Sequence, residues 1–260
     1  MYDAIVLDLD GVIFKGIEVI TGVEEAFQIL ITKGVQFSFV SNNVSRSKAE
    51  VLRKLENLLP EHSIDIFDPI DVLERFYLYK RRDSAQAFMV IGTHNLKERL
   101  AGLGITVAPE DSTFNISSVL VSSAVGFGYK QLTYAAKAVR NGAKLYASGC
   151  EPVFLWQGEL NPGSGALVAA IEVASNSRAI VLGKPSVRIF RIASENFIKP
   201  SRIVVIGDDI VTDIHGAKNA GLDSVLVLSG ITSMKQLKNS KVKPNYVAND
   251  LLSFLTSMIK

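Results

Sequence analysis

Four polar clusters interrupt an otherwise apolar pattern, and each follows a hydrophobic run of the kind that forms a buried strand. The clusters are Asp8-Leu9-Asp10-Gly11-Val12, Ser41-Asn42-Asn43, Gly183-Lys184-Pro185-Ser186, and Gly207-Asp208-Asp209 with Asp213 five residues after Asp208. Because ligands of open parallel sheets bind outside the carboxyl ends of the strands, four separate segments could line one crevice. Their carboxylates, amides, hydroxyl and ammonium suit a hard metal cation and a phosphate group.

Asp8 and Asp10 are the most informative of these residues. Ala4 to Leu9 is an apolar run broken only by Asp8, and an unpaired carboxylate buried there would be costly. A turn formed by Asp10 and the following glycine would explain Asp10 alone, whereas a cation with oxygen ligands explains Asp8 as well. Asp208, which also follows an apolar run, would complete the anionic side of such a site.

The other cluster residues each have a structural explanation beside the functional one. Lys184 follows a strand, where its charge could reach solvent or neutralise a phosphoryl group and nearby carboxylates. Ser41 and Asn42 could bind phosphate oxygens or cap the helix that starts nearby. Asp213 could support the metal site or cap the helix that reaches Ala220.

Short apolar runs alternate with helix-period segments, and this alternation predicts mainly parallel sheets with right-handed crossovers. Strands are expected at Ala4–Leu9, Val35–Val40, Ala87–Ile91, Ser118–Ser122, Lys144–Ala147, Ala179–Leu182, Ile203–Ile206 and Ser224–Leu228. Helices are expected after Thr21, after Ser47, over 95–103, 130–140, 166–174 and 187–197, and up to Ala220. Capping boxes are expected for Thr21 with Glu24 and for Ser47 with Glu50, a cap at Asn249, and a loop over 148–165.

Composition limits the size of the core, the binding partners and the cellular location that can be expected. The chain has 260 residues, 48% of them hydrophobic, and a net charge of +2, so it can bury a sizeable core and has no strong field that favours nucleic acid. The basic stretches Lys80–Arg82 and Lys235 to Lys243 lack interleaved aromatics, which favours a solvated surface over a nucleic-acid patch. A single cysteine, Cys150, excludes an internal disulfide. With no signal-peptide pattern and no apolar run long enough to span a membrane, we expect a cytoplasmic protein.

In this order, from Asp8 to about Gly230, the clusters resemble the signature of the haloacid dehalogenase superfamily. Further residues resemble its class IIA branch, the NagD and p-nitrophenyl-phosphatase-like group. These are Ser41-Asn42-Asn43 followed by Ser45-Arg46-Ser47, Asn141-Gly142-Ala143, Asn161-Pro162-Gly163-Ser164-Gly165, Gly183-Lys184-Pro185, and Gly207-Asp208 through Thr212-Asp213-Ile214. The resemblance implies an α/β fold, with a Rossmann-like parallel-sheet core at 1–69 and 179–260 and an inserted α/β cap domain at 70–178.

The resemblance also implies a site and a reaction. Mg²⁺ is expected on Asp8, the backbone carbonyl of Asp10, and Asp208, while phosphate is expected on Ser41, Asn42 and Lys184. Asp8 is expected to be the nucleophile, and Asp10 the general acid and base. The supporting residues are Asp209, Asp213 and Asn43.

The reaction implied is hydrolysis of a small phosphorylated metabolite, such as a sugar phosphate, a nucleotide, phosphoglycolate or a p-nitrophenyl phosphate-like ester. The alternatives are a phosphotransferase or mutase, and a non-catalytic phosphoryl-binding relative. A non-catalytic relative should have lost Asp8, Asp10 or Asp208. All three are present, which favours an enzyme. A homodimer formed through the cap is expected, with neither a nucleic-acid nor a membrane partner.

Two departures from the family pattern concern the substrate. The family usually has a Gly-Leu-Asp-like turn where this chain reads Ser122-Ser123-Ala124-Val125, and Thr-Asn-x-Asp where it reads Ser148-Gly149-Cys150-Glu151. Because both lie in the expected cap, they leave the substrate open. The loop carrying Ser148 and Glu151 is either the part of the cap that faces the substrate or an ordinary surface loop.

Overall fold

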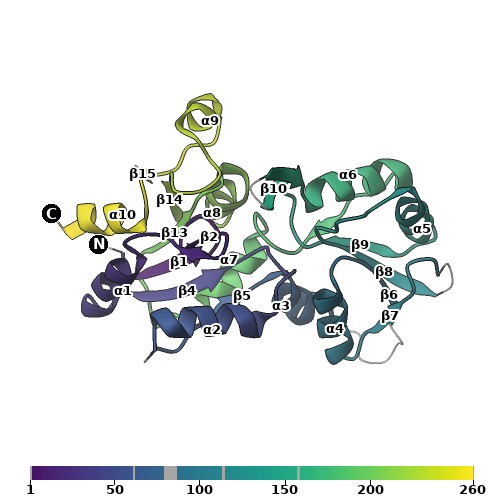
Figure 1. Ribbon diagram of the computed structural model, residues 1–260, viewed down its shortest axis with the longest axis horizontal. Helices are drawn as coiled ribbons and strands as arrows, with labels where there is room; N and C mark the ends of the chain where they lie inside the picture. The colour runs from purple at the N-terminus through teal and green to yellow at the C-terminus, as the bar shows by residue number, and fades with distance from the viewer. Residues whose placement is uncertain (1, 61, 79–86, 113–114, 157–158, 260) are drawn as a thin grey trace. The chain divides into compact units, whose positions relative to one another are not determined.

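The computed structural model describes residues 2–60, 62–78, 87–112, 115–156 and 159–259 (Figure 1). The basic stretch Lys80–Arg82 lies outside these residues. The chain forms two compact units. The core unit comprises Met1–Ser41, Ala49–Phe67 and Lys184–Lys260, and the cap unit comprises Asn42–Lys48 and Asp68–Gly183. Among the helices described, none has the length and apolar character needed to cross a membrane.

The core unit is built on a six-stranded sheet in the order β15-β14-β13-β1-β4-β5 (Figure 1). The strands are β1 (Ala4–Asp8), β4 (Gln36–Val40), β5 (Ile66–Phe67), β13 (Ile203–Gly207), β14 (Asp223–Val227) and β15 (Tyr246–Ala248). All five pairings are parallel, and Leu7 of β1 lies opposite Ile206 on one side and Phe39 on the other. The parallel core predicted from the alternating pattern is therefore confirmed.

Helices cover both faces of this sheet, as the alternation of side chains along β4 demonstrates. Phe39 packs edge-on against Phe27, with ring centroids 6.1 Å apart, whereas the hydroxyl of Ser38 donates to the carbonyl of Ala193 at 2.8 Å. Neighbouring strand residues point to opposite faces, so the helices carrying Phe27 and Ala193 lie on opposite sides. The elements around the sheet are the β2–β3 hairpin (Phe14–Lys15, Glu18–Val19), α1 (Val23–Thr32), α2 (Lys48–Leu58), α7 (Val187–Ser194), the π-helical turn η2 (Ile210–Ile214), α8 (His215–Asn219), α9 (Met234–Asn239) and α10 (Leu251–Ile259).

The cap unit has its own five-stranded parallel sheet, in the order β12-β9-β8-β6-β7. Its strands are β6 (Ala87–Ile91), β7 (Thr106–Ala108), β8 (Ile116–Val121), β9 (Lys144–Ala147) and β12 (Ile180–Val181), and β10 (Val153–Trp156) pairs with β11 (Glu159–Pro162) in a separate hairpin. Leu145 joins the apolar cluster formed with α5 (Tyr129–Arg140) and α6 (Ser164–Ser175). The next residue, Tyr146, instead contacts Tyr77, with ring centroids 5.3 Å apart. Tyr77 lies in the π-helical turn η1 (Glu74–Leu78), which follows α3 (Pro69–Leu73), and α4 (His94–Gly102) follows β6.

Three local predictions were wrong. The helix after Thr21 has Gly22, and not Thr21, at its N-cap; glycine suits the left-handed φ of 88° at this position and has no side chain to cap the helix. The last helix is capped by Asp250, whose carboxylate accepts from the Ser253 N–H at 2.7 Å, and not by Asn249. The segment predicted as a loop contains the β10–β11 hairpin.

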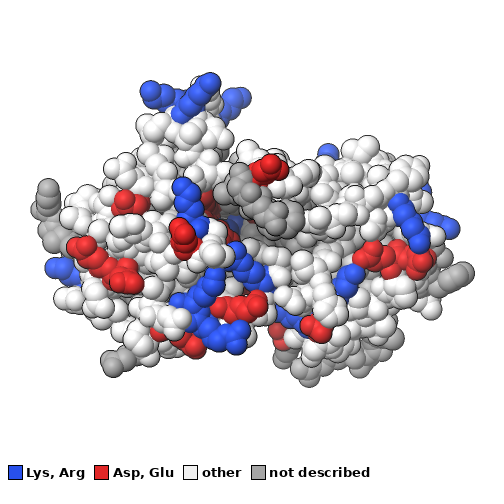
Figure 2. Space-filling view, in the orientation of Figure 1, with Lys and Arg blue, Asp and Glu red and all other residues white. Residues whose placement is uncertain are grey.

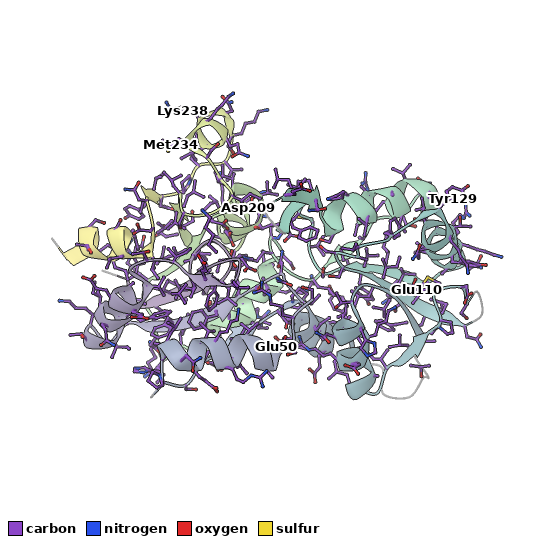
Figure 3. The ribbon with its side chains drawn as sticks, in the orientation of Figure 1. Glu50, Glu110, Tyr129, Asp209, Met234 and Lys238 are labelled. Atoms are coloured by element: carbon purple, nitrogen blue, oxygen red, sulfur yellow. The ribbon has the colours of Figure 1, made fainter. Side chains whose placement is uncertain are left out.

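The lysines around α9 are exposed, as predicted. Blue side chains gather over this helix in Figure 2, and Lys238 and Met234 lie on it at the edge of the core unit in Figure 3. Lys243 also has a structural contact, since its ammonium donates to the Leu237 carbonyl at 2.7 Å. Cations near the last carbonyls of a helix stabilise its C-terminus.

Candidate active site

The strand order of the core unit brings three of the four predicted clusters to one edge of the sheet. Asp8 is the last residue of β1, Ser41 directly follows β4, and Asp208 directly follows β13. Strand β1 pairs with both β4 and β13. Since the carboxyl ends of parallel strands meet at the same edge, these residues lie side by side where open α/β sheets bind their ligands.

Lys184 lies at the centre of a buried cluster of charges. Its ammonium nitrogen is 2.7 Å from Asp8 Oδ1 and 2.7 Å from Asp213 Oδ1, and its side chain is 3% exposed. Asp8, Asp208 and Asp213 each offer a carboxylate oxygen, and these oxygens lie within 4.8 Å of one another. The structure therefore brings four of the predicted residues into one buried cluster: Asp8, Lys184, Asp208 and Asp213.

The cluster alters the proton affinity of its members. Burial raises the pKa of Asp8 well above its ordinary value, with Lys184 opposing the rise and Asp213 and Asp208 adding to it. Burial and the neighbouring Asp213 raise the pKa of Asp208 to about 7. Burial alone would lower the pKa of Lys184, but the carboxylates of Asp213 and Asp8 outweigh it and the pKa is raised. Lys184 is thus a fixed cation, and the carboxyl groups of Asp8 and Asp208 hold their protons more tightly than ordinary aspartates do.

These residues fit a divalent metal ion. Three buried carboxylates face one ammonium, so their ionised forms leave excess negative charge where water is scarce, which is costly. Carboxylate oxygens are also the ligands that hard cations such as Mg²⁺ and Ca²⁺ prefer. A divalent cation would balance the cluster, and Asp8, Asp208 and Asp213 are the side chains that could hold or support it.

Asp209 and Asp213 have distinct structural roles. The side chain of Asp209 caps η2 by accepting from the Val211 N–H at 2.7 Å. The capping role considered for Asp213 therefore belongs to Asp209, and Asp213 itself lies inside η2. Asp213 is completely buried, and its second oxygen accepts from the Asp209 N–H at 3.1 Å. Its two oxygens thus fix Lys184 and the turn that follows Asp208.

Asp10 lies in the core unit, two residues after the end of β1, whereas Asn42, Asn43, Ser148 and Glu151 lie in the cap unit. Asn42 donates its side-chain amide to one carboxylate oxygen of Glu151, and Ser164 donates its hydroxyl to the other at 3.0 Å. Ser148 is buried, and its carbonyl accepts from the Gly183 N–H at 3.0 Å. Both oxygens of Glu151 are therefore used within the cap unit itself.

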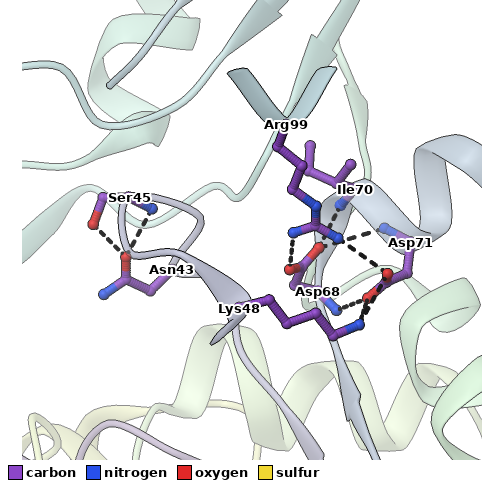
Figure 4. Close-up of polar contacts among 7 residues, drawn as sticks. All are labelled: Asn43, Ser45, Lys48, Asp68, Ile70, Asp71 and Arg99. Carbon is purple, nitrogen blue, oxygen red and sulfur yellow. Dashed lines mark hydrogen bonds and ion pairs between the residues drawn. The ribbon is translucent and has the colours of Figure 1, made fainter. Parts of the chain in front are cut away.

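Asn43 closes a turn. Its side-chain oxygen accepts from the backbone N–H of Ser45 at 3.1 Å and from the Ser45 hydroxyl at 2.6 Å (Figure 4). These bonds stabilise the loop that follows Ser41 and Asn42.

An ion-pair cluster that the sequence did not suggest holds the start of α2 within the cap unit (Figure 4). Arg99 contacts the carboxylates of Asp68 and Asp71, and the Lys48 ammonium lies 3.0 Å from Asp71. Asp68 also caps α3, accepting from the Ile70 N–H at 2.8 Å. Burial raises the pKa of Asp71, Asp68 adds to the rise, and Lys48 and Arg99 oppose it.

The segment that follows β14 contains two further residues at the site, Ser229 and Ile231, that were not predicted from the sequence. The backbone N–H of Ile231 donates to Asp208 Oδ2 at 2.7 Å, and the hydroxyl of Ser229 donates to the Gly11 carbonyl at 2.6 Å. The signal was present in the sequence, because Ser229-Gly230 follows the predicted strand Ser224–Leu228 much as the other clusters follow theirs.

Comparison with known proteins identifies phosphatases that share this fold. Residues 5–106 match the family model described as haloacid dehalogenase-like hydrolase, and residues 181–254 match the related HAD-hydrolase-like model. Rat (Rattus norvegicus) chronophin is 31% identical over 89% of this chain and 78% of its own. The structure of p-nitrophenyl phosphatase from Archaeoglobus fulgidus has a TM-score of 0.85 at 26% identity, covering 98% of this chain and 99% of that one.

Glycerol phosphate phosphatase from Mycobacterium tuberculosis, solved in complex with magnesium, has a TM-score of 0.80 at 27% identity, covering 97% of this chain and 76% of its own. It has also been solved in complex with calcium. This chain belongs to the haloacid dehalogenase-like hydrolases, with a Rossmann-like core and an α/β cap. Within them it belongs to the class IIA, NagD and p-nitrophenyl-phosphatase-like branch, and it is a hydrolase of phosphate monoesters.

Proposed function

We propose that the protein is a Mg²⁺-dependent phosphatase of small metabolites that forms an aspartyl-phosphate on Asp8. One observation carries the proposal: Asp8 is buried, 2.7 Å from the Lys184 ammonium, and grouped with Asp208 and Asp213. A carboxylate with no catalytic task would seldom be kept in such a costly position. Residues 1–69 and 179–260 are proposed as the catalytic core, and 70–178 as the cap.

In the proposed mechanism, Asp8 attacks the phosphorus atom and the ester oxygen leaves in line with it. Lys184 binds a phosphoryl oxygen with its ammonium, and Ser41 and Asn42 contribute a hydroxyl and an amide, so that positioning and charge neutralisation lower the barrier. Bound Mg²⁺ would neutralise the carboxylates and polarise the phosphoryl group.

Asp10 supplies the proton transfers in this mechanism. Its carboxylic acid donates a proton to the leaving alcohol, and the resulting carboxylate then removes a proton from the water that hydrolyses the aspartyl-phosphate. A group that serves as acid and then as base returns to its starting state after each turnover. This property favours a hydrolase over a protein that keeps its phosphoryl group.

The substrate class rests on the relatives. Similar structures belong to a glycerol phosphate phosphatase and to p-nitrophenyl phosphatases, so we propose small phosphomonoesters. Mg²⁺ as the working metal is supported by the magnesium complex of the first of these. The single cysteine, Cys150, supports a reducing compartment such as the cytoplasm.

Phosphate release from p-nitrophenyl phosphate, measured with Mg²⁺ and after chelation, tests the proposal. Turnover that requires Mg²⁺ and returns when Mg²⁺ is restored is expected. Transfer of the phosphoryl group to an added sugar in preference to water would indicate a phosphotransferase instead. Binding of phosphate without turnover would indicate a non-catalytic relative.

A further inference from the structure

The segment after β14 contacts the two turns that carry Asp10 and Asp208. The Ser229 hydroxyl donates to the carbonyl of Gly11, the residue next to Asp10, at 2.6 Å. Two residues further on, the Ile231 N–H donates to Asp208 Oδ2 at 2.7 Å. A single segment thus binds the turn of the proposed acid and the carboxylate of the proposed metal site.

Packing restricts both Gly11 and Gly230 to glycine. Gly11 has a φ of +87°, and a Cβ there would lie 2.2 Å from Asp208 Oδ2. A Cβ at Gly230 would lie 1.8 Å from the same oxygen. Both positions therefore require glycine, which leaves the Asp10–Gly11 turn with no side chain of its own at position 11 to anchor it.

We propose that Ser229 is a positioning residue for Asp10. Its hydrogen bond holds the peptide group between Gly11 and Val12, and through it the turn from which the neighbouring Asp10 presents its carboxyl group. Proton transfer requires the acid within hydrogen-bond reach of the leaving oxygen, and small displacements of a reacting group are costly. This inference rests on the proposed function, because it assumes that Asp10 acts as the acid.

A purely structural hydrogen bond is the alternative, and the chain offers a matched control for it. Ser257 in α10 also donates its hydroxyl to a backbone carbonyl, that of Phe254, at 2.6 Å. Ser257→Ala removes a comparable bond from the same unit without contact to the charged cluster. Its effect on stability estimates what one such bond contributes, and it should leave turnover unchanged.

The test compares two esters that differ in how much they need an acid. The leaving group of p-nitrophenyl phosphate departs as a stable anion, whereas an alkyl ester such as glycerol 3-phosphate must be protonated as it leaves. For Ser229→Ala we expect kcat/KM to fall roughly tenfold on the alkyl ester and less than about threefold on p-nitrophenyl phosphate. Mg²⁺ affinity, measured by calorimetry, should be largely retained, because the carboxylates of Asp8 and Asp208 are unaltered.

Ser229→Thr, which keeps the hydroxyl, should restore kcat/KM on the alkyl ester. If Ser229→Ala does not fold, Ser229→Thr and Ser229→Val make the same comparison, because they match in shape and differ in the hydroxyl. An equal loss on both esters, no loss, or no rescue by threonine would overturn the assignment. Wild-type protein that hydrolyses neither ester would overturn the proposed function itself, a result distinct from any of these.

Discussion

Replacing Lys184 with methionine removes the one cation of the buried cluster while keeping much of its volume. The Lys184 ammonium lies 2.7 Å from an oxygen of Asp8 and 2.7 Å from an oxygen of Asp213. Removing one partner of a buried ion pair leaves the other uncompensated and costs about 3–5 kcal/mol of unfolding free energy. For a chain of this size, that corresponds to a fall in Tm of roughly 6–20 °C.

Thermal melting in metal-free buffer measures this effect. Lys184→Met should melt far below the wild type, and added Mg²⁺ should raise its Tm more than that of the wild type, because more negative charge is left to balance. Turnover should fall by about 10²–10³-fold even with saturating Mg²⁺, since the charge on the phosphoryl oxygens is lost as well.

Lys238→Met is the control, because Lys238 is exposed on α9 (Figure 3). A surface substitution of this kind usually changes unfolding free energy by less than about 0.5 kcal/mol. If Lys184→Met melts within about 2 °C of the wild type and still releases phosphate, the reasoning about the buried cluster is refuted.

Three further predictions concern the acid, the metal and the cap. Asp10→Asn keeps its backbone carbonyl, so calorimetry should find Mg²⁺ binding retained while kcat falls by about 10²–10⁴-fold; collapse of the affinity would make Asp10 a side-chain ligand. Because burial raises the pKa of Asp208 to about 7, the metal-free protein keeps a proton that the unfolded chain releases. Its stability should therefore fall as the pH rises from about 4 to about 7, and Mg²⁺ affinity should rise towards pH 7; an affinity that does not change with pH would contradict this. Glu151→Ala should lower kcat/KM by a similar factor across a panel of esters, because Glu151 holds Asn42 and Ser164; an uneven loss would show instead that it contacts the leaving group.

The central residues of the site could be predicted because their chemistry conflicts with their surroundings. Asp8, Lys184 and Asp208 are charged residues at the ends of apolar runs, and such charges need partners. Once the runs are assigned as parallel strands, the partners must lie at one edge of the sheet. The structure places Asp8 and Asp208 at one edge of the core sheet, as inferred. Lys184 instead follows β12 of the cap-unit sheet, and its ammonium still lies 2.7 Å from Asp8.

What could not be predicted depends on contacts between distant parts of the chain. The N-cap of α1 is Gly22, which has a left-handed φ and against which Leu252 of α10 packs, a contact that no local pattern reveals. The bond between Ser229 and Gly11 joins residues 218 positions apart and involves a neutral hydroxyl. A neutral group carries no charge that demands a partner, so its role becomes visible only when the strand ends are brought together.

The β10–β11 hairpin was missed for a different reason. It lies among the Gly, Pro and Asn residues that are typical of loops, and Asn161 and Pro162 belong to β11 itself. Pairing with the neighbouring strand overrode local propensity, which is weak evidence for short strands.

The kcat/KM of Asp8→Asn with p-nitrophenyl phosphate and Mg²⁺ tests the central claim most directly. An amide cannot serve as the nucleophile, so turnover should fall by more than about 10³-fold, while thermal melting shows that the protein is still folded. Residual activity within about tenfold of the wild type, equivalent to about 1.4 kcal/mol of barrier, would contradict the assignment of Asp8 as the residue that receives the phosphoryl group.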